Sequence, residues 1–163
     1  MPGNRRAIAG VDDSKQLDRG ERERLARIIL GRALGVGLGA ASVHEIDRVN
    51  IYNATVLAMR RALGRLPLTP AEILIDGRPI NRLGIVHRAV VEGDDRCFSI
   101  ACASIVAKVT RDRLMVRLAA RYPGFCWERN AGYATPDHLS AVEELGLTPH
   151  HRRSFINNQL SLW

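Results

Sequence analysis

The sequence has few cysteines and no long apolar run, and both features limit the kinds of protein that it can encode. The cysteines are odd in number and none forms a Cys-x-x-Cys pair: Cys97, Cys102 and Cys126. This pattern fits neither a disulfide framework nor a zinc site, and it favours free thiols in a reducing cytoplasm. No apolar stretch is long enough to span a bilayer, and residues 1–10 lack the apolar core of a signal peptide.

Internal repeats, low-complexity tracts and linkers are also absent from the sequence. A length of 163 residues predicts a single domain over 1–163, and a hydrophobic content of 46% is enough for a core. The net charge of +7 favours a polyanionic partner, with nucleic acid as the first candidate. A solvated basic surface without such a partner stays open as an alternative.

Strands and helices are predicted to alternate through the middle of the chain, which indicates the α/β class. Short apolar runs between turn residues predict strands at 73–76 and 85–91. Residues 34–40 alternate glycine with apolar side chains, which predicts a third strand. One face of this strand would pack Leu34, Val36 and Leu38. The other face would carry only glycines, so a neighbouring segment should approach it closely. Capping boxes at 18–21 and 42–45, together with helix stop signals, predict helices at about 19–34, 43–49, 50–66, 99–121 and 136–145.

Two of the predicted strands are followed by carboxylates, Asp76 and Asp94. If the strands are neighbours, these acids lie together at one edge of the sheet and repel each other. A divalent cation bound between two such carboxylates usually offsets this repulsion. Acids gathered in a basic protein are typical of a metal-dependent nuclease. The alternative is that Asp76 only begins a turn with Gly77.

Several short motifs run in order through nearly the whole chain. The N-terminal half has Asp-Ser-Lys-x-Leu at 13–17, Glu-Ile-Asp-x-x-Asn-Ile at 45–51 and Ala-Thr-x-x-Ala-Met at 54–59. These motifs resemble those of bacterial ribonuclease HII, and the third and fourth acids of that family match Asp76 and Asp94. Further matches lie in the long predicted helix at 103–112 and in the C-terminal signatures at 132–139 and 151–155.

The resemblance implies a ribonuclease H-like α/β fold, in which a mixed sheet is flanked by helices and followed by a C-terminal helical region. It implies an endonuclease that cleaves the RNA strand of RNA·DNA hybrids and incises at ribonucleotides embedded in DNA, as a cytoplasmic monomer acting in repair. It assigns catalysis and the binding of Mn²⁺ or Mg²⁺ to Asp76 and Asp94. It also assigns substrate contacts to Lys15 and Tyr133.

One family motif has no counterpart in the sequence. The family's first two acids and its ribonucleotide-recognition loop lie in Val-Asp-Glu-x-Gly-Arg-Gly, and no such string is present. Either Asp12 and Asp13 serve as the acid pair, or the chain lacks the family's first two strands. We favour the second interpretation and expect an N-terminally incomplete polypeptide. The rival functions are a non-catalytic nucleic-acid-binding remnant and an inactive fragment.

We therefore predict that the 163-residue chain cleaves a ribonucleotide-containing duplex weakly or not at all, because two carboxylates cannot hold two dications as four do. Extending the reading frame upstream should add the absent motif and restore Mn²⁺- or Mg²⁺-dependent cleavage. Gel assays of both chains test this. Strong cleavage by the short chain that is lost on Asp12→Asn or Asp13→Asn would instead identify those residues as the acid pair.

Overall fold

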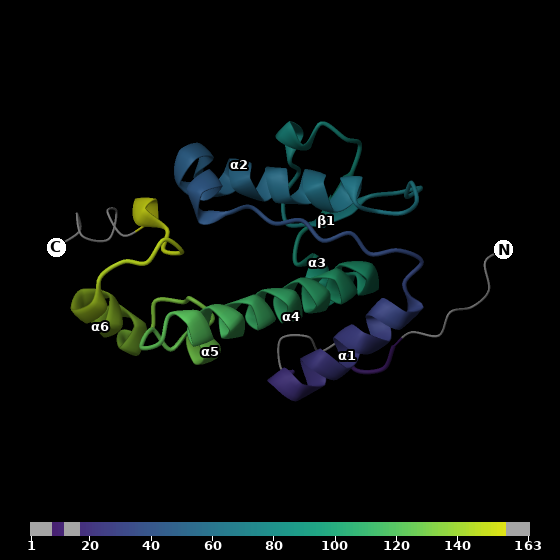
Figure 1. Ribbon diagram of the computed structural model, residues 1–163. Coiled ribbons are helices and arrows are strands. Elements are labelled where there is room, and N and C mark those ends of the chain that lie inside the picture. Colours follow the sequence, from purple (N-terminus) through teal and green to yellow (C-terminus); the bar gives the residue numbers. More distant parts are fainter. Residues whose placement is uncertain (1–7, 12–16, 156–163) are drawn as a thin grey trace. The chain divides into compact units, whose positions relative to one another are not determined.

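The computed structural model describes residues 8–11 and 17–155, and its two short strands follow two helices and precede a helical C-terminal half (Figure 1). This helix-rich chain with a small sheet is consistent with the α/β class. The elements are α1 (Arg19–Arg32), α2 (Val43–Gly64), β1 (Leu74–Asp76), the 3₁₀ helix η2 (Asn81–Leu83), β2 (Arg88–Val90), α3 (Gly93–Arg96), α4 (Phe98–Arg121), α5 (Trp127–Asn130) and α6 (Pro136–Leu145).

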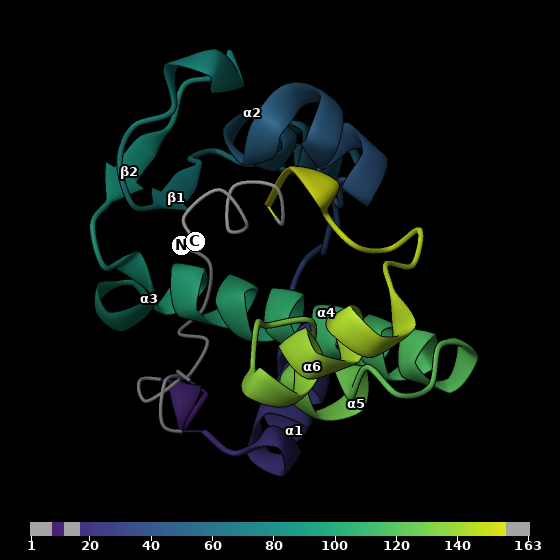
Figure 2. The same ribbon diagram turned by 90° about the vertical axis from the view of Figure 1, so that its left-hand side faces the viewer.

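The two strands pair in parallel and form the sheet of the described residues (Figure 2). Leu74 lies opposite Arg88, and Asp76 lies opposite Val90. The strand predicted at 73–76 is confirmed, and the one predicted at 85–91 is confirmed in a shorter form. Because the strands are parallel, both run toward the same edge of the sheet.

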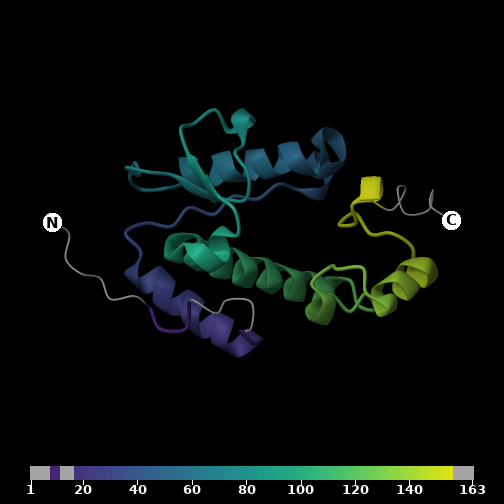
Figure 3. The same ribbon diagram turned by 180° about the vertical axis from the view of Figure 1, so that it is seen from behind.

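The chain folds as two compact units, of which the first comprises Met1–Gly37 and Arg65–Thr110. Its core lies where α1 runs beside the N-terminal part of α4 (Figure 3). The small residues Ala101 and Cys102 in the first turns of α4 let the two helices approach closely. The buried residues of this core are Ile8, Val11, Leu25, Ala26, Ile29, Ala101, Ile105, Val106 and Val109.

The second unit comprises Leu38–Gly64 and Arg111–Trp163. Its helix α2 consists of two helical segments joined at Asn50, whose φ of 65° and ψ of 169° are not helical. The Asn50 side chain accepts a hydrogen bond from the Asn53 N–H at 3.1 Å and so caps the second segment. The predicted division between helices 43–49 and 50–66 is therefore confirmed.

The N-terminus of α2 is held by the reciprocal capping box that the sequence predicts. The Ser42 N–H donates to Glu45 Oε2 at 2.8 Å, and the Glu45 N–H donates to Ser42 Oγ at 3.3 Å. Arg61, from the second segment, donates to both Glu45 carboxylate oxygens at 2.6 and 3.0 Å, and to the Ala40 carbonyl at 2.7 Å. The Arg61 guanidinium, followed by the Ser42 donors, lowers the pKa of Glu45 to about 2.

A distant carboxylate caps the last helical turn of the described chain, at 153–155. Asp47 accepts hydrogen bonds from the Arg153 N–H at 3.2 Å and from the Ser154 N–H at 3.1 Å. The Ser154 hydroxyl donates to the same carboxylate at 2.5 Å. These bonds fasten the C-terminal segment to α2.

The strand predicted at 34–40 is wrong, because no strand is assigned there. A strand needs a neighbour for its hydrogen-bond ladder, and the described residues place no strand beside this segment. Its apolar side chains are not packed on one face as predicted, because Leu34 is 72% exposed and Leu38 is 41% exposed. The predicted close approach at the glycines is confirmed: a Cβ at Gly39 would lie 1.9 Å from the Ala58 carbonyl oxygen.

Gly39→Ala should therefore destabilise the protein by at least about 1–3 kcal/mol, because the added methyl group meets the backbone of α2 rather than a movable side chain. Gly31→Ala is the matched control, since Gly31 lies inside α1 with nothing within 4 Å of an added Cβ. It should stabilise by about 0.5–1 kcal/mol. Urea unfolding of both variants measures the difference, and equal stabilities would contradict the close approach at Gly39.

Candidate functional site

Asp76 is the exposed last residue of β1, and its carboxylate is tied to the segment that follows β2. The Gly93 N–H donates a hydrogen bond to Asp76 Oδ1 at 2.7 Å. The backbone pairing also continues beyond the strand, because the Gly77 N–H donates to the Val90 carbonyl at 2.9 Å. Gly77 has a φ of 89°, so Asp76 does precede a turn, as the simpler interpretation expected. The turn and the contact with Gly93 coexist.

Position 93 must be a glycine for the hydrogen bond between its N–H and the Asp76 carboxylate to form. A Cβ at Gly93 would lie 2.6 Å from Ile100 Cδ1 and 3.2 Å from Asp76 Oδ1. Glu92, which precedes Gly93, has a left-handed φ of 55° and turns the chain after β2. Asp94 then falls in the first turn of α3 and is half-buried. The structure thus brings Asp76 against the residue that immediately precedes Asp94.

Two carboxylates suit a hard divalent cation such as Mg²⁺ or Mn²⁺ better than a softer ion such as Zn²⁺. Carboxylate oxygens are the ligands that Mg²⁺ prefers, and Mg²⁺ is commonly held by one or two carboxylates while it keeps several waters. Within residues 8–11 and 17–155, no group of three or more His, Cys, Asp or Glu side chains is arranged to hold a metal ion. Metal binding by Asp76 and Asp94 therefore stays a prediction, to which the described part of the chain adds no third ligand of these types.

Tyr133, the predicted substrate contact, lies in the second unit and is 59% exposed. The Arg111 guanidinium carbon lies 5.1 Å from the centre of its ring, which is a cation–π contact. The other predicted substrate contact, Lys15, lies outside the described residues, as do Asp12 and Asp13.

His151 is buried in the second unit, where its contacts are with other residues of the fold. It is 7% exposed, and its Nδ1 accepts a hydrogen bond from the Thr148 N–H at 3.0 Å. Its ring stacks on His138, with centroids 5.3 Å apart and planes 14° apart. Burial, followed by the charge of His138, lowers the pKa of His151. The neutral ring is therefore the form that this site favours.

The chain matches a family of known proteins over almost all of its length. The family model described as Ribonuclease HII covers residues 5–158. The chain belongs to the ribonuclease HII family. The ribonuclease HII of Granulibacter bethesdensis is 53% identical over 150 residues, which are 91% of this chain and 68% of that protein. The ribonuclease HII of Cereibacter sphaeroides is 57% identical over 157 residues, which are 95% of this chain and 72% of that protein.

A solved structure confirms the ribonuclease H-like fold. The crystal structure of ribonuclease H2 from Pyrococcus horikoshii has a TM-score of 0.73 and 26% sequence identity, and the match covers 89% of this chain and 76% of that one. Membership of the ribonuclease HII family places the chain among endoribonucleases that generally depend on divalent metal ions. Both the predicted family and the predicted enzyme class are confirmed.

Two further predictions concern cysteines and membranes. Cys97, Cys102 and Cys126 are free, as the sequence predicts, and all three are half-buried. Among the residues that the structure describes, no helix combines the length and apolar character needed to cross a bilayer.

Some residues around the candidate site were not singled out from the sequence. Gly93 was noticed only as the neighbour of Asp94, although a glycine directly before an acid after a strand is a signal of close backbone approach. Arg111 was read as one basic residue among many, because no local pattern connects it to Tyr133, 22 positions later in the sequence. Only the folded chain shows these contacts.

The lowered pKa of His151 predicts how stability depends on pH. Histidine in the unfolded chain has a pKa near 6.5, above the folded value, so acid protonates the unfolded state first. The contribution of His151 is thus complete above about pH 7, falls as the pH drops through 6.5, and levels off below the folded pKa. His151→Gln should flatten the fall in unfolding midpoint between pH 7 and 5. A wild-type protein that gains stability over that range would contradict this assignment.

Proposed function

We propose that the reaction of this chain is that of a divalent-metal-dependent endonuclease, which hydrolyses the RNA strand of RNA·DNA hybrids and incises DNA at embedded ribonucleotides, at no more than the low rate predicted above for the 163 residues. The proposal rests on the ribonuclease HII family match and on the two acids at one edge of the sheet. We further propose that it acts in the cytoplasm as a monomer. The net charge of +7 suits a polyanionic substrate of this kind.

One observation supports the site above all others: the 2.7 Å hydrogen bond from the Gly93 N–H to Asp76 Oδ1. It ties the end of β1 to the start of α3, and it keeps the carboxylates of Asp76 and Asp94 on neighbouring segments. In this proposal both carboxylates hold one Mn²⁺ or Mg²⁺ ion through oxygen atoms. Such an ion, when bound, neutralises charge on the scissile phosphate and lowers the pKa of a bound water.

Asp94→Asn should weaken Mn²⁺ binding by at least about tenfold, because it removes the charge of a proposed ligand. Asp95→Asn is the matched control, since Asp95 is the exposed neighbour in the same helix and carries the same charge. Electron paramagnetic resonance of free Mn²⁺ measures affinity directly, whether cleavage is fast or slow. Equal affinities of the two variants for Mn²⁺ would remove Asp94 from the site.

Tyr133 and Lys15 are the proposed substrate contacts. An exposed aromatic ring can pack against a sugar, and Tyr133 has its ring in solvent with a guanidinium beside it. Arginine next to the ring also supplies a charge for a nearby phosphate. Lys15 is proposed to contact the phosphate backbone, which adds affinity without distinguishing ribose from deoxyribose.

Tyr133→Leu should reduce the preference for a duplex with one ribonucleotide over the all-DNA duplex, because the ring rather than the charge senses the sugar. We expect about a three- to tenfold loss in the ratio of the two dissociation constants, as for one base-stacking contact. Tyr52→Leu is the control, since Tyr52 is another exposed tyrosine of the same unit. Fluorescence anisotropy with labelled duplexes gives both constants, and equal losses for the two duplexes would indicate a purely structural Tyr133.

A further inference from the structure

The loop that presents Tyr133 is built from an uncommon run of backbone conformations. α5 ends at Asn130, and the next two residues are both left-handed, with φ of 49° at Ala131 and 77° at Gly132. A left-handed alanine costs free energy, so other contacts must hold the chain in this shape. Tyr133 follows directly, and its orientation depends on the path of this loop.

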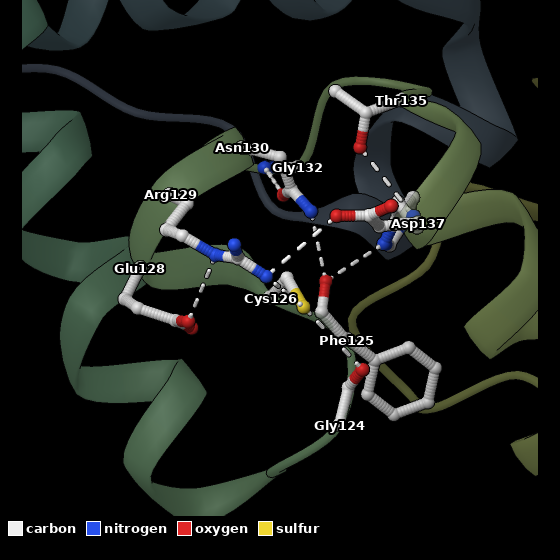
Figure 4. Close-up of polar contacts among 10 residues, drawn as sticks. Gly124, Phe125, Cys126, Glu128, Arg129, Asn130, Gly132, Thr135 and Asp137 are labelled. Carbon is white, nitrogen blue, oxygen red and sulfur yellow. Dashed lines mark hydrogen bonds and ion pairs between the residues drawn. The ribbon is translucent and has the colours of Figure 1, made fainter.

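The Asn130 side chain supplies those contacts (Figure 4). It is 8% exposed, its Nδ2 donates to the Phe125 carbonyl at 2.8 Å, and its Oδ1 accepts from the Gly132 N–H at 2.8 Å. The Asn130 backbone carbonyl also accepts from the Tyr133 N–H at 2.9 Å. The Asn130 side chain therefore bonds to the backbone before α5, at Phe125, and to the backbone directly before Tyr133, at Gly132.

Neighbouring groups complete the fixed side of the turn. The Phe125 carbonyl also contacts His138 Nδ1 at 3.2 Å, so two side chains converge on this one acceptor. Phe125 and Trp127 are buried and stack on each other, with ring centroids 5.3 Å apart. Asn130 thus connects a rigid aromatic cluster to an exposed loop.

We propose that Asn130 is a positioning residue for Tyr133, and that its two side-chain hydrogen bonds set the selectivity for a ribonucleotide. This inference rests on the proposed role of Tyr133 in sensing the sugar. Tyr133 is 59% exposed, so the position of its ring depends strongly on the backbone beneath it. A group that reads one hydroxyl must be held to within about 0.5 Å, which the fixed turn provides.

Asparagine suits this position because the site requires one donor and one acceptor on the same planar group. Aspartate has the same shape and still accepts from the Gly132 N–H, but it places a carboxylate oxygen against the Phe125 carbonyl. Asn130→Asp therefore disturbs the turn while it keeps the side-chain volume. Gly132→Ala disturbs the same turn from the other side, because an added Cβ is strained at a φ of 77° and lies 3.1 Å from Met115 Cε.

The test measures dissociation constants for a duplex with one ribonucleotide and for the matching all-DNA duplex, in the full chain with Mn²⁺. Asn130→Asp and Gly132→Ala should each lower the ratio of the two constants by about three- to tenfold, with less than about a twofold change for all-DNA. Asp137→Asn is the control: it removes an exposed 3.6 Å ion pair with Arg129 in the same region (Figure 4) and should leave the ratio unchanged.

A double-mutant cycle distinguishes positioning from a separate structural effect. In a Tyr133→Leu background, Asn130→Asp should cause no further loss of selectivity, because it acts through the ring. Additive losses would overturn the inference, as would wild-type selectivity in both turn variants while Tyr133→Leu has lost it. A wild-type chain with no selectivity at all would instead overturn the proposed function, and this inference with it.

Discussion

The parallel register of β1 and β2 is the constraint on which the candidate site depends. Parallel strands run in one direction, so the segments that follow them leave from the same edge of the sheet. Asp76 opposite Val90 places the last residue of β1 level with the last residue of β2. A slip of one residue would turn the Asp76 side chain to the opposite face and break its hydrogen bond with Gly93. The register of these two short strands therefore fixes where the Asp76 carboxylate lies relative to Gly93.

Features that depend on neighbours in sequence were predictable. The capping box at Ser42, the break at Asn50, and the Thr135 cap before Pro136 each involve residues within a few positions of one another. The predicted capping box at 18–21 forms only in part: Asp18 accepts from the Glu21 N–H at 2.8 Å, whereas the Glu21 carboxylate pairs with Arg24 at 2.5 Å. The two strands were predictable because each was short, apolar and bounded by turn residues, but their pairing was assumed and only the structure shows it.

Features that depend on distant residues were not predictable. The glycine alternation at 34–40 correctly indicated close approach but not what approaches, which is the backbone of α2 at Gly39 rather than a neighbouring strand. Nothing in the local sequence marks Asn130 as a positioning residue, because its partners in the turn have no sequence signature of their own. In each case, only the fold identified the neighbour.

The capping of residues 153–155 by Asp47 has a consequence for biosynthesis. Asp47 and its partners Arg153 and Ser154 are 106 and 107 positions apart, although the bonds between them are ordinary cap bonds. At about 5–20 residues per second, a ribosome makes α2 roughly five to twenty seconds before the residues that complete its surroundings. During that interval the Asp47 carboxylate on the nascent α2 has no C-terminal turn to cap. The bonds that fasten the C-terminal segment to α2 can therefore form only after that segment has been translated.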